Sequence, residues 1–295
     1  MDSPAGQPPL PDDSAVRRFL FEDADLRGEI VRVDGALRDL LANHQYAPAV
    51  RELLGEFLAA AVLLATTLKF DGRLTLQARS AGQIPLIMAE CTSELTVRAI
   101  ARGAQEATAS RFAELLGDGQ LAITVEPERG RRYQGIVPLT GDSLAASLDA
   151  YFEQSEQLHT QVWLASDGGR AAGLLLQQLP TQLTPDPLER EAQWEHACAL
   201  AATVAQEELL GLDAAALLYR LYHEDPLRLY DPQAVAFRCS CSRERSRQAL
   251  TTLGEAEIRD ILREQGSVTM DCEFCNQQYV FTAPELLPEA ADPLH

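Results

Sequence analysis

The segment Phe237-Arg238-Cys239-Ser240-Cys241-Ser242, together with Cys272-Glu273-Phe274-Cys275, decides how the last part of this chain folds. These two stretches hold four of the six cysteines of the chain. Two close cysteine pairs joined by a spacer can supply the four thiolates of a tetrahedral zinc site, because each pair provides one edge of the tetrahedron. The sequence therefore predicts one Zn²⁺ bound by Cys239, Cys241, Cys272 and Cys275.

The spacing of the pairs differs from that of an ordinary zinc ribbon. One pair is the tighter Cys-x-Cys, and the spacer, residues 242–271, exceeds the usual length of about 15 to 20 residues. A purely structural zinc site is the common role of four thiolates. Three features favour a redox role instead: each pair can close a small disulfide ring, the pairs follow a weakly held segment, and basic residues surround the first pair. Four arginines against one glutamate give a local excess of +3, and nearby cations stabilise reactive thiolates; these residues are Arg238, Arg243, Arg245, Arg247 and Glu244.

The composition is that of a soluble globular protein, with 46% apolar and 23% charged residues among 295. The formal charge of −19, from 44 acidic and 25 basic residues, disfavours nucleic acid and anionic membranes as partners. Residues 1–9 contain neither a basic stretch nor an apolar run, so they do not form a signal peptide. We therefore expect a cytoplasmic protein, in which clustered cysteines serve as ligands or redox groups and not as permanent disulfides.

The first part of the chain predicts an α+β domain. Residues 57–68 are largely apolar, too short to cross a bilayer, and predict a buried helix whose apolar residues from 47 to 68 fall on one side. A second helix is predicted for residues 143–154, with Ser143 as its N-cap. Short strand-like runs separated by turns predict mostly antiparallel pairing; these runs are residues 27–33, 73–78, 84–89, 95–100, 121–125, 133–139, 161–165 and 173–178.

Three prolines in residues 180–187 mark a domain boundary. Beyond it, residues 188–210 and 213–223 predict two helices, which must be stabilised by docking on a neighbour because they have little core of their own. The predicted organisation is a disordered tail (1–14), an α+β core (15–180), a helical linker (181–232) and a small four-cysteine zinc domain (233–295).

Common catalytic motifs are missing from the sequence. It contains no phosphate-binding G-x-x-x-x-G-K-[ST], no G-x-S-x-G and no H-E-x-x-H, and its one lysine, Lys69, lies in the region of the buried helix. The five histidines show no ligand spacing, and Cys91 and Cys198 have the settings of small buried apolar residues. The sequence therefore predicts that the chain is not an enzyme.

After the first 14 or so residues the chain resembles a known family over nearly its whole length. The resemblance is carried by the two cysteine motifs in this order and by several short segments: His44-Gln45-Tyr46-Ala47-Pro48, Leu54-Gly55-Glu56, Thr67-Leu68-Lys69-Phe70-Asp71-Gly72, Tyr133-Gln134-Gly135-Ile136-Val137 and Tyr151-Phe152-Glu153-Gln154-Ser155-Glu156-Gln157. The family is that of the bacterial redox-regulated heat-shock chaperones called 33 kDa chaperonins, or heat shock protein 33.

This resemblance implies a chaperone that holds unfolding proteins without ATP. It implies that Cys239, Cys241, Cys272 and Cys275 bind one zinc ion in the reduced, inactive protein. Peroxide or hypochlorous acid would then form two disulfides, Cys239 with Cys241 and Cys272 with Cys275, with loss of the metal and unfolding of the linker. The resemblance also implies unfolded client proteins as partners and a homodimer in the activated state.

Two other readings of the cysteines stay open from the residues alone. A zinc-ribbon adaptor could bind nucleic acid or a ribosome through the arginines of residues 238–247, although the overall charge opposes it. Four cysteines can also hold an iron–sulfur cluster, which would colour the protein.

Overall fold

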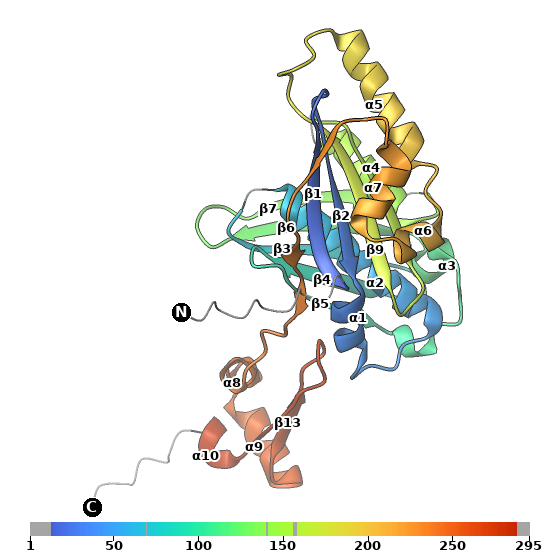
Figure 1. Cartoon of the computed structure of the whole chain (residues 1–295). Helices are drawn as coiled ribbons and strands as arrows, with labels where there is room; N and C mark the ends of the chain where they lie inside the picture. The colour runs from blue at the N-terminus through green and yellow to red at the C-terminus, as the bar shows by residue number, and fades with distance from the viewer. Residues whose placement is uncertain (1–12, 69, 140, 156–157, 288–295) are drawn as a thin grey trace, which may run out of the picture. The chain divides into compact units, whose positions relative to one another are not determined.

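The computed structural model describes residues 13–68, 70–139, 141–155 and 158–287, and Figure 1 shows the whole chain. It divides into two compact units, Met1–Arg238 and Cys239–His295. Most of the predicted tail and the lone lysine, Lys69, lie outside the described residues. Within the described ranges, no helix combines the length and the apolar character needed to span a bilayer.

The first unit contains two sheets. One sheet has the order β10-β1-β2-β9-β8, with β11 also pairing β1. Its strands are β1 (Ser14–Phe21), β2 (Leu26–Val33), β8 (Thr160–Ser166), β9 (Ala171–Gln178), β10 (Leu227–Leu229) and β11 (Gln233–Ala234). Neighbouring residues on one strand face opposite sides of a sheet. Ile30 and Leu174 are buried on one face, whereas Val31 and Leu175 are buried on the other, so this sheet is covered on both faces.

The second sheet has the order β12-β5-β4-β3-β6-β7. Its strands are β3 (Gly72–Ser80), β4 (Leu86–Thr92), β5 (Thr96–Arg102), β6 (Gly119–Pro127), β7 (Tyr133–Pro138) and β12 (Ala236–Phe237). Among the described strands, β12 with β5 is the one parallel pair. The prediction of an α+β fold with mostly antiparallel sheets is confirmed.

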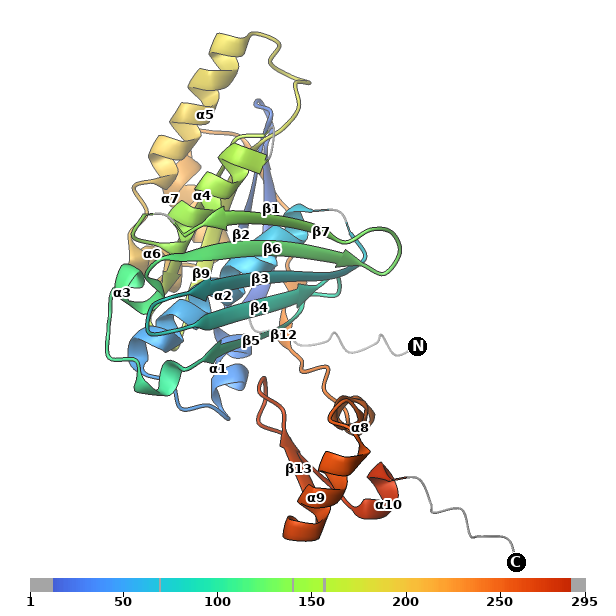
Figure 2. The same cartoon turned by 180° about the vertical axis from the view of Figure 1, so that it is seen from behind.

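Helix α2 (Pro48–Thr67) lies between the two sheets, whose strands run across one another in Figures 1 and 2. The buried helix predicted from the sequence is confirmed, but its burial on one side only is wrong. Ala59, Ala60, Val62 and Leu63 are fully buried as well, because sheets pack on opposite sides of the helix. Helix α2 therefore forms the centre of the main core.

Shorter helices complete the core. They are α1 (Asp34–Leu41), a 3₁₀ turn η1 (Ala104–Glu106), α3 (Phe112–Leu116) and α4 (Leu144–Ser155). The Oγ atom of Ser143 accepts a hydrogen bond from the Ala146 N–H at 3.1 Å, which confirms the predicted cap of α4. Strand β1 and helix α1 had no clear sequence signal, since Arg17 and Arg18 interrupt the apolar pattern of the strand and the helix is only 8 residues long.

Three helices follow the proline-rich boundary: α5 (Pro187–Ala201), α6 (Gln206–Gly211) and α7 (Ala214–Tyr222). The single helix predicted for residues 188–210 is thus two helices. The chain leaves the helical path between them, where Arg220 donates hydrogen bonds to the Thr203 hydroxyl at 2.7 Å and to its carbonyl at 3.1 Å. All three helices pack on the face of the first sheet that is remote from α2.

The second unit is small. It contains α8 (Arg243–Thr251), α9 (Glu255–Gln265), the hairpin of β13 (Val268–Asp271) with β14 (Gln278–Phe281), and α10 (Ala283–Leu286). Its core consists of the buried residues Leu250, Ile258, Val268, Phe281 and Leu286. Residues 233–238 belong to the first unit, because β11 and β12 extend its two sheets.

Candidate metal centre

Four cysteines come together in the second unit. The Sγ atoms of Cys239, Cys241, Cys272 and Cys275 all lie within 4.8 Å of one another. The Sγ–Sγ distance is 3.6 Å between Cys239 and Cys272 and 3.5 Å between Cys241 and Cys275. The structure thus brings together all four residues that the sequence singled out, and all six cysteines of the chain are free thiols.

Local backbone structure presents each pair. Cys272 and Cys275 lie in the turn between β13 and β14, where the Cys272 carbonyl accepts the N–H groups of Cys275 at 3.3 Å and Asn276 at 2.7 Å. Asn276 has a φ of 54°, a left-handed conformation that asparagine tolerates better than most residues. Cys239 and Cys241 precede α8, whose N-terminus is capped by Ser242. The second pair is therefore held by a short turn, and the first pair directly precedes the capped end of a helix.

The cluster has the donors and the size of a tetrahedral metal site. Sulfur atoms about 2.3 Å from a central zinc ion would lie about 3.8 Å from one another, close to the two distances above. Four soft thiolates without nitrogen or carboxylate donors suit zinc or an iron–sulfur cluster and not a hard cation such as Mg²⁺. The residues present therefore fit a single four-coordinate metal ion.

The four thiols have different electrostatic environments. Burial raises the pKa of Cys239 and of Cys275. Burial acts in the same direction on Cys241, but hydrogen bonds from Tyr279 and from the other thiols outweigh it, and the pKa of Cys241 is lowered. The Tyr279 hydroxyl donates to the Cys241 Sγ at 3.2 Å, and this bond raises the pKa of Tyr279 to about 12. Tyr279 is a site residue that its sequence position did not reveal.

Two of the arginines near the first cysteine pair form ion pairs with glutamates, which reduces the local positive charge. Arg243 pairs with Glu285, with its Nε atom 3.2 Å from the carboxylate, and its guanidinium lies 4.6 Å from the centre of the Phe281 ring. Hydrogen bonds from Arg243 lower the pKa of Glu285 to about 2. Arg247 pairs with Glu244 at 2.9 Å. The expected excess of +3 was too large, because folding adds the charge of Glu285.

The remaining two cysteines lie outside the cluster. Cys91 is fully buried on β4, and burial raises its pKa to about 12. Cys198 is partly buried on α5, and burial, with the charges of Asp149 and Glu191, raises its pKa to about 12. The expectation that Cys91 is a small buried residue is confirmed, and Cys198 packs at the edge of the linker core.

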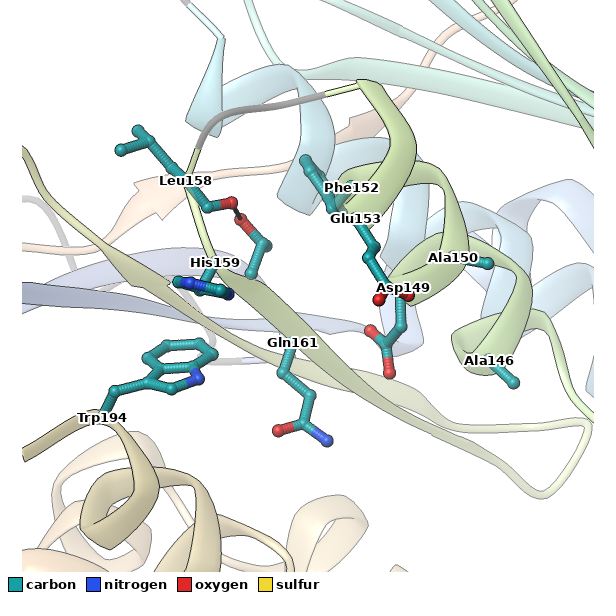
Figure 3. A pocket seen from close by; sticks show the side chains of 10 residues that line it. Ala146, Asp149, Ala150, Phe152, Glu153, Leu158, His159, Gln161 and Trp194 are labelled. Atoms are coloured by element: carbon teal, nitrogen blue, oxygen red, sulfur yellow. Dashed lines mark hydrogen bonds between the residues drawn. The ribbon is translucent and has the colours of Figure 1, made fainter. Parts of the chain in front are cut away.

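A hollow of about 500 Å³ lies where α5 meets α4 and β8, and Figure 3 shows the side chains that line it. Asp149 and Glu153 project from α4, and the rings of His159 and Trp194 lie 6.1 Å apart across from them. The Asp149 carboxylate accepts the Val162 N–H at 3.0 Å, and burial raises the pKa of Asp149 to about 6. This hollow brings together core and linker residues that no sequence motif connected.

Comparison with known proteins identifies the family. The model of the Hsp33 protein family matches residues 14–282. A 33 kDa chaperonin of Pseudomonas savastanoi is 51% identical over 280 residues, covering 94% of this chain and 93% of the relative. The 33 kDa chaperonin of Azotobacter vinelandii is 54% identical over 273 residues and 92% of each chain.

A solved structure shares the fold. The crystal structure of the 33 kDa chaperonin from Thermotoga maritima superposes with a TM-score of 0.80 at 23% identity, covering 93% of this chain and 96% of that one. Together with the family match over most of the sequence, this confirms the resemblance seen in the motifs. The chain therefore belongs to the Hsp33 family, which consists of chaperones and not of enzymes, as the sequence predicted.

Proposed function

We propose that this protein is a redox-regulated holdase of the cytoplasm that acts without ATP. In the reduced state Cys239, Cys241, Cys272 and Cys275 would hold one Zn²⁺, and the protein would be inactive. Oxidation would convert it to a form that binds unfolding proteins and prevents their aggregation. The observation that carries the proposal is the gathering of four thiols in a unit with little core of its own.

The second unit has too few buried apolar residues to be stable by packing alone. Its core is five residues, and domains of about 60 residues or fewer are marginally stable without metals or disulfides. A bound zinc ion supplies folding free energy to such a site. We therefore expect the four thiolates and the fold of residues 239–287 to depend on each other.

Oxidation removes the ligands. In the proposed step, two thiols of a pair form one S–S bond and give up two electrons and two protons, and one hydrogen peroxide accepts them to become two waters. Two such steps give disulfides Cys239–Cys241 and Cys272–Cys275, the pairing that the family resemblance implies. Sulfur contacts of 3.6 Å and 3.5 Å run between the pairs, so peptide mapping of the oxidised protein should test this pairing directly.

The linker supplies the response. Helices α5 to α7 cover an apolar face of the first sheet that includes Phe19, Phe21, Ile30, Leu174 and Leu176. These helices bury their apolar residues mainly against that face of the sheet. When the helices undock, the face of the sheet is therefore exposed as well. Once the second unit unfolds, the linker loses support on its C-terminal side. The uncovered apolar surface would then bind clients, and two activated chains would form a homodimer.

A redox and metal comparison tests the function. Reduced wild-type protein should contain about one zinc per chain and should not suppress aggregation of a thermally unfolding enzyme, whereas peroxide-treated protein should lose the zinc and suppress aggregation. Cys272→Ser should lose zinc and expose residues 239–287 to proteolysis, because one ligand of four is gone. Cys198→Ser, outside the cluster, is the matched control and should behave as wild type. Equal holding activity in the reduced and oxidised forms would rule out the redox switch, and iron in the reduced protein would rule out the zinc site.

A further inference from the structure

The edge of strand β5 is occupied by a very short strand of the same chain. Strand β12 consists of Ala236 and Phe237 and pairs in parallel with Thr96 and Val97. The Ala236 N–H donates to the Leu95 carbonyl at 3.1 Å, and the Arg238 N–H donates to the Val97 carbonyl at 3.0 Å. These contacts involve backbone atoms alone, so any extended segment with free N–H groups could make them.

The side chains of this segment alternate in burial. Val235 is 4% exposed and belongs to the main core, Phe237 packs partly buried against the same core, and Ala236 between them is exposed. Helix α1 contacts β12 from the side. We call this site the β5 slot: the backbone edge of residues 95–97 and the apolar surface that receives Val235 and Phe237. The slot selects an extended segment with apolar residues two positions apart.

The occupant pairs over only two residues and lies directly before the candidate metal centre in the sequence. Two residues of pairing are short for a strand, and only Arg238 separates β12 from Cys239. Leu95, which accepts the first hydrogen bond, has a φ of 57°, an uncommon conformation for a leucine. The backbone just before β5 is therefore held in a left-handed conformation that glycine, and not leucine, adopts easily.

We infer that the β5 slot, when β12 leaves it, binds extended segments of unfolding client proteins that carry apolar residues two positions apart. This inference rests on the proposed activation, which would free both ends of β12. The vacated edge of β5 would present unpaired carbonyl and N–H groups, and such edges accept a peptide strand from another chain. Unfolded proteins offer exposed backbone and apolar side chains together, which is the chemistry that β12 itself uses.

A peptide with the sequence of residues 233–238 tests the slot. Labelled Gln-Ala-Val-Ala-Phe-Arg should bind oxidised wild-type protein in fluorescence anisotropy, should not bind the reduced protein, and should displace a bound client. A control peptide with Asp in place of both Val and Phe should bind at least about 100-fold more weakly, since each lost apolar contact corresponds to about a factor of ten. Client holding that persists undiminished at saturating peptide would overturn the inference.

A variant separates the slot from the redox switch. Phe237→Asp should weaken β12 in its own slot, so the reduced variant should already bind the peptide. Ala236→Asp places the same charge on the same strand at an exposed position and should not bind it. If reduced Phe237→Asp binds the peptide but oxidation of the wild-type protein does not produce client holding, the slot is supported and only the redox proposal is wrong. If the peptide dissociates an oxidised dimer without displacing clients, the slot receives β12 of a second copy, and the inference is wrong.

Discussion

Replacing Asp25 by Ala should release the start of the linker while leaving the core folded. Asp25 lies in the turn between β1 and β2, and its side chain is 5% exposed. Its carboxylate accepts the N–H groups of Gln182 at 3.0 Å, Leu183 at 3.0 Å and Thr184 at 3.2 Å, and Arg190 of α5 donates to it at 2.9 Å. One side chain thus holds both the segment before α5 and the first turn of that helix.

The magnitude follows from these partners. Removing one member of a buried ion pair costs about 3 to 5 kcal/mol, because the other charge stays buried and unpaired. Gln182 and Leu183 are exposed, so water can replace the lost acceptor there, and Arg190 is 14% exposed. We therefore take the lower figure, about 3 kcal/mol, which corresponds to about a 150-fold increase in local opening.

Amide hydrogen exchange on the reduced, zinc-loaded protein measures this opening. Amides of α5 should exchange about 150-fold faster in Asp25→Ala, and those of α2 should be unchanged, because the cost falls on the linker and not on the central core. Asp23→Ala, an exposed carboxylate in the same turn, is the control and should shift exchange by less than about threefold. Unchanged exchange in α5, or equal acceleration in α2, would contradict the assignment of Asp25 to linker docking.

Three further perturbations should give distinct results. Arg32 donates to the carbonyls of Leu210 at 2.8 Å and Leu212 at 2.9 Å, so Arg32→Ala should speed exchange in α6 about 30-fold, a loss of about 2 kcal/mol, whereas the exposed Arg38→Ala should not. Phe281 is fully buried, so Phe281→Ala should cost about 3 to 5 kcal/mol and speed protease cleavage within residues 239–287 of the reduced, zinc-loaded protein, whereas Val280→Ala, 42% exposed, should not. Burial raises the pKa of Asp149 to about 6, so the folded state binds its proton more tightly than the unfolded state and stability falls as pH rises from about 4 to about 6. Asp149→Asn should remove that part of the pH dependence and raise the melting temperature at pH 7. If the melting temperature of the variant depends on pH between about 4 and 6 as that of wild type does, burial does not raise the pKa of Asp149.

The sequence predicted those features that repeat locally. Helix α2 was predicted because a long apolar run with few helix-breaking residues, and apolar residues at helical spacing, is typical of a buried helix. Strands β2 to β9 were found because short apolar runs alternate with turns. Strands β1 and β10 to β14 were missed, since their pairing partners and not their own residues make them strands.

The candidate metal centre likewise combines features set by the local sequence with contacts between distant residues. The sequence predicted the cluster of Cys239, Cys241, Cys272 and Cys275 from their spacing, because two thiolates that are close in sequence can chelate one metal ion. The hydrogen bond from Tyr279 to Cys241 and the ion pair of Arg243 with Glu285 could not be read from spacing. Both join residues about 40 positions apart, and only the folded hairpin and helix bring them into reach.

The sequence by itself determined the family, the α+β class and the four cysteines, because motifs and periodicity are properties of short segments. Only the tertiary structure decided that α2 is buried by two sheets, that the linker helices cover the apolar face containing Phe19 and Leu174, and that β12 fills the edge of β5. These last features depend on long-range burial and strand pairing. Their free energy comes from surfaces that meet only when distant parts of the chain are folded together.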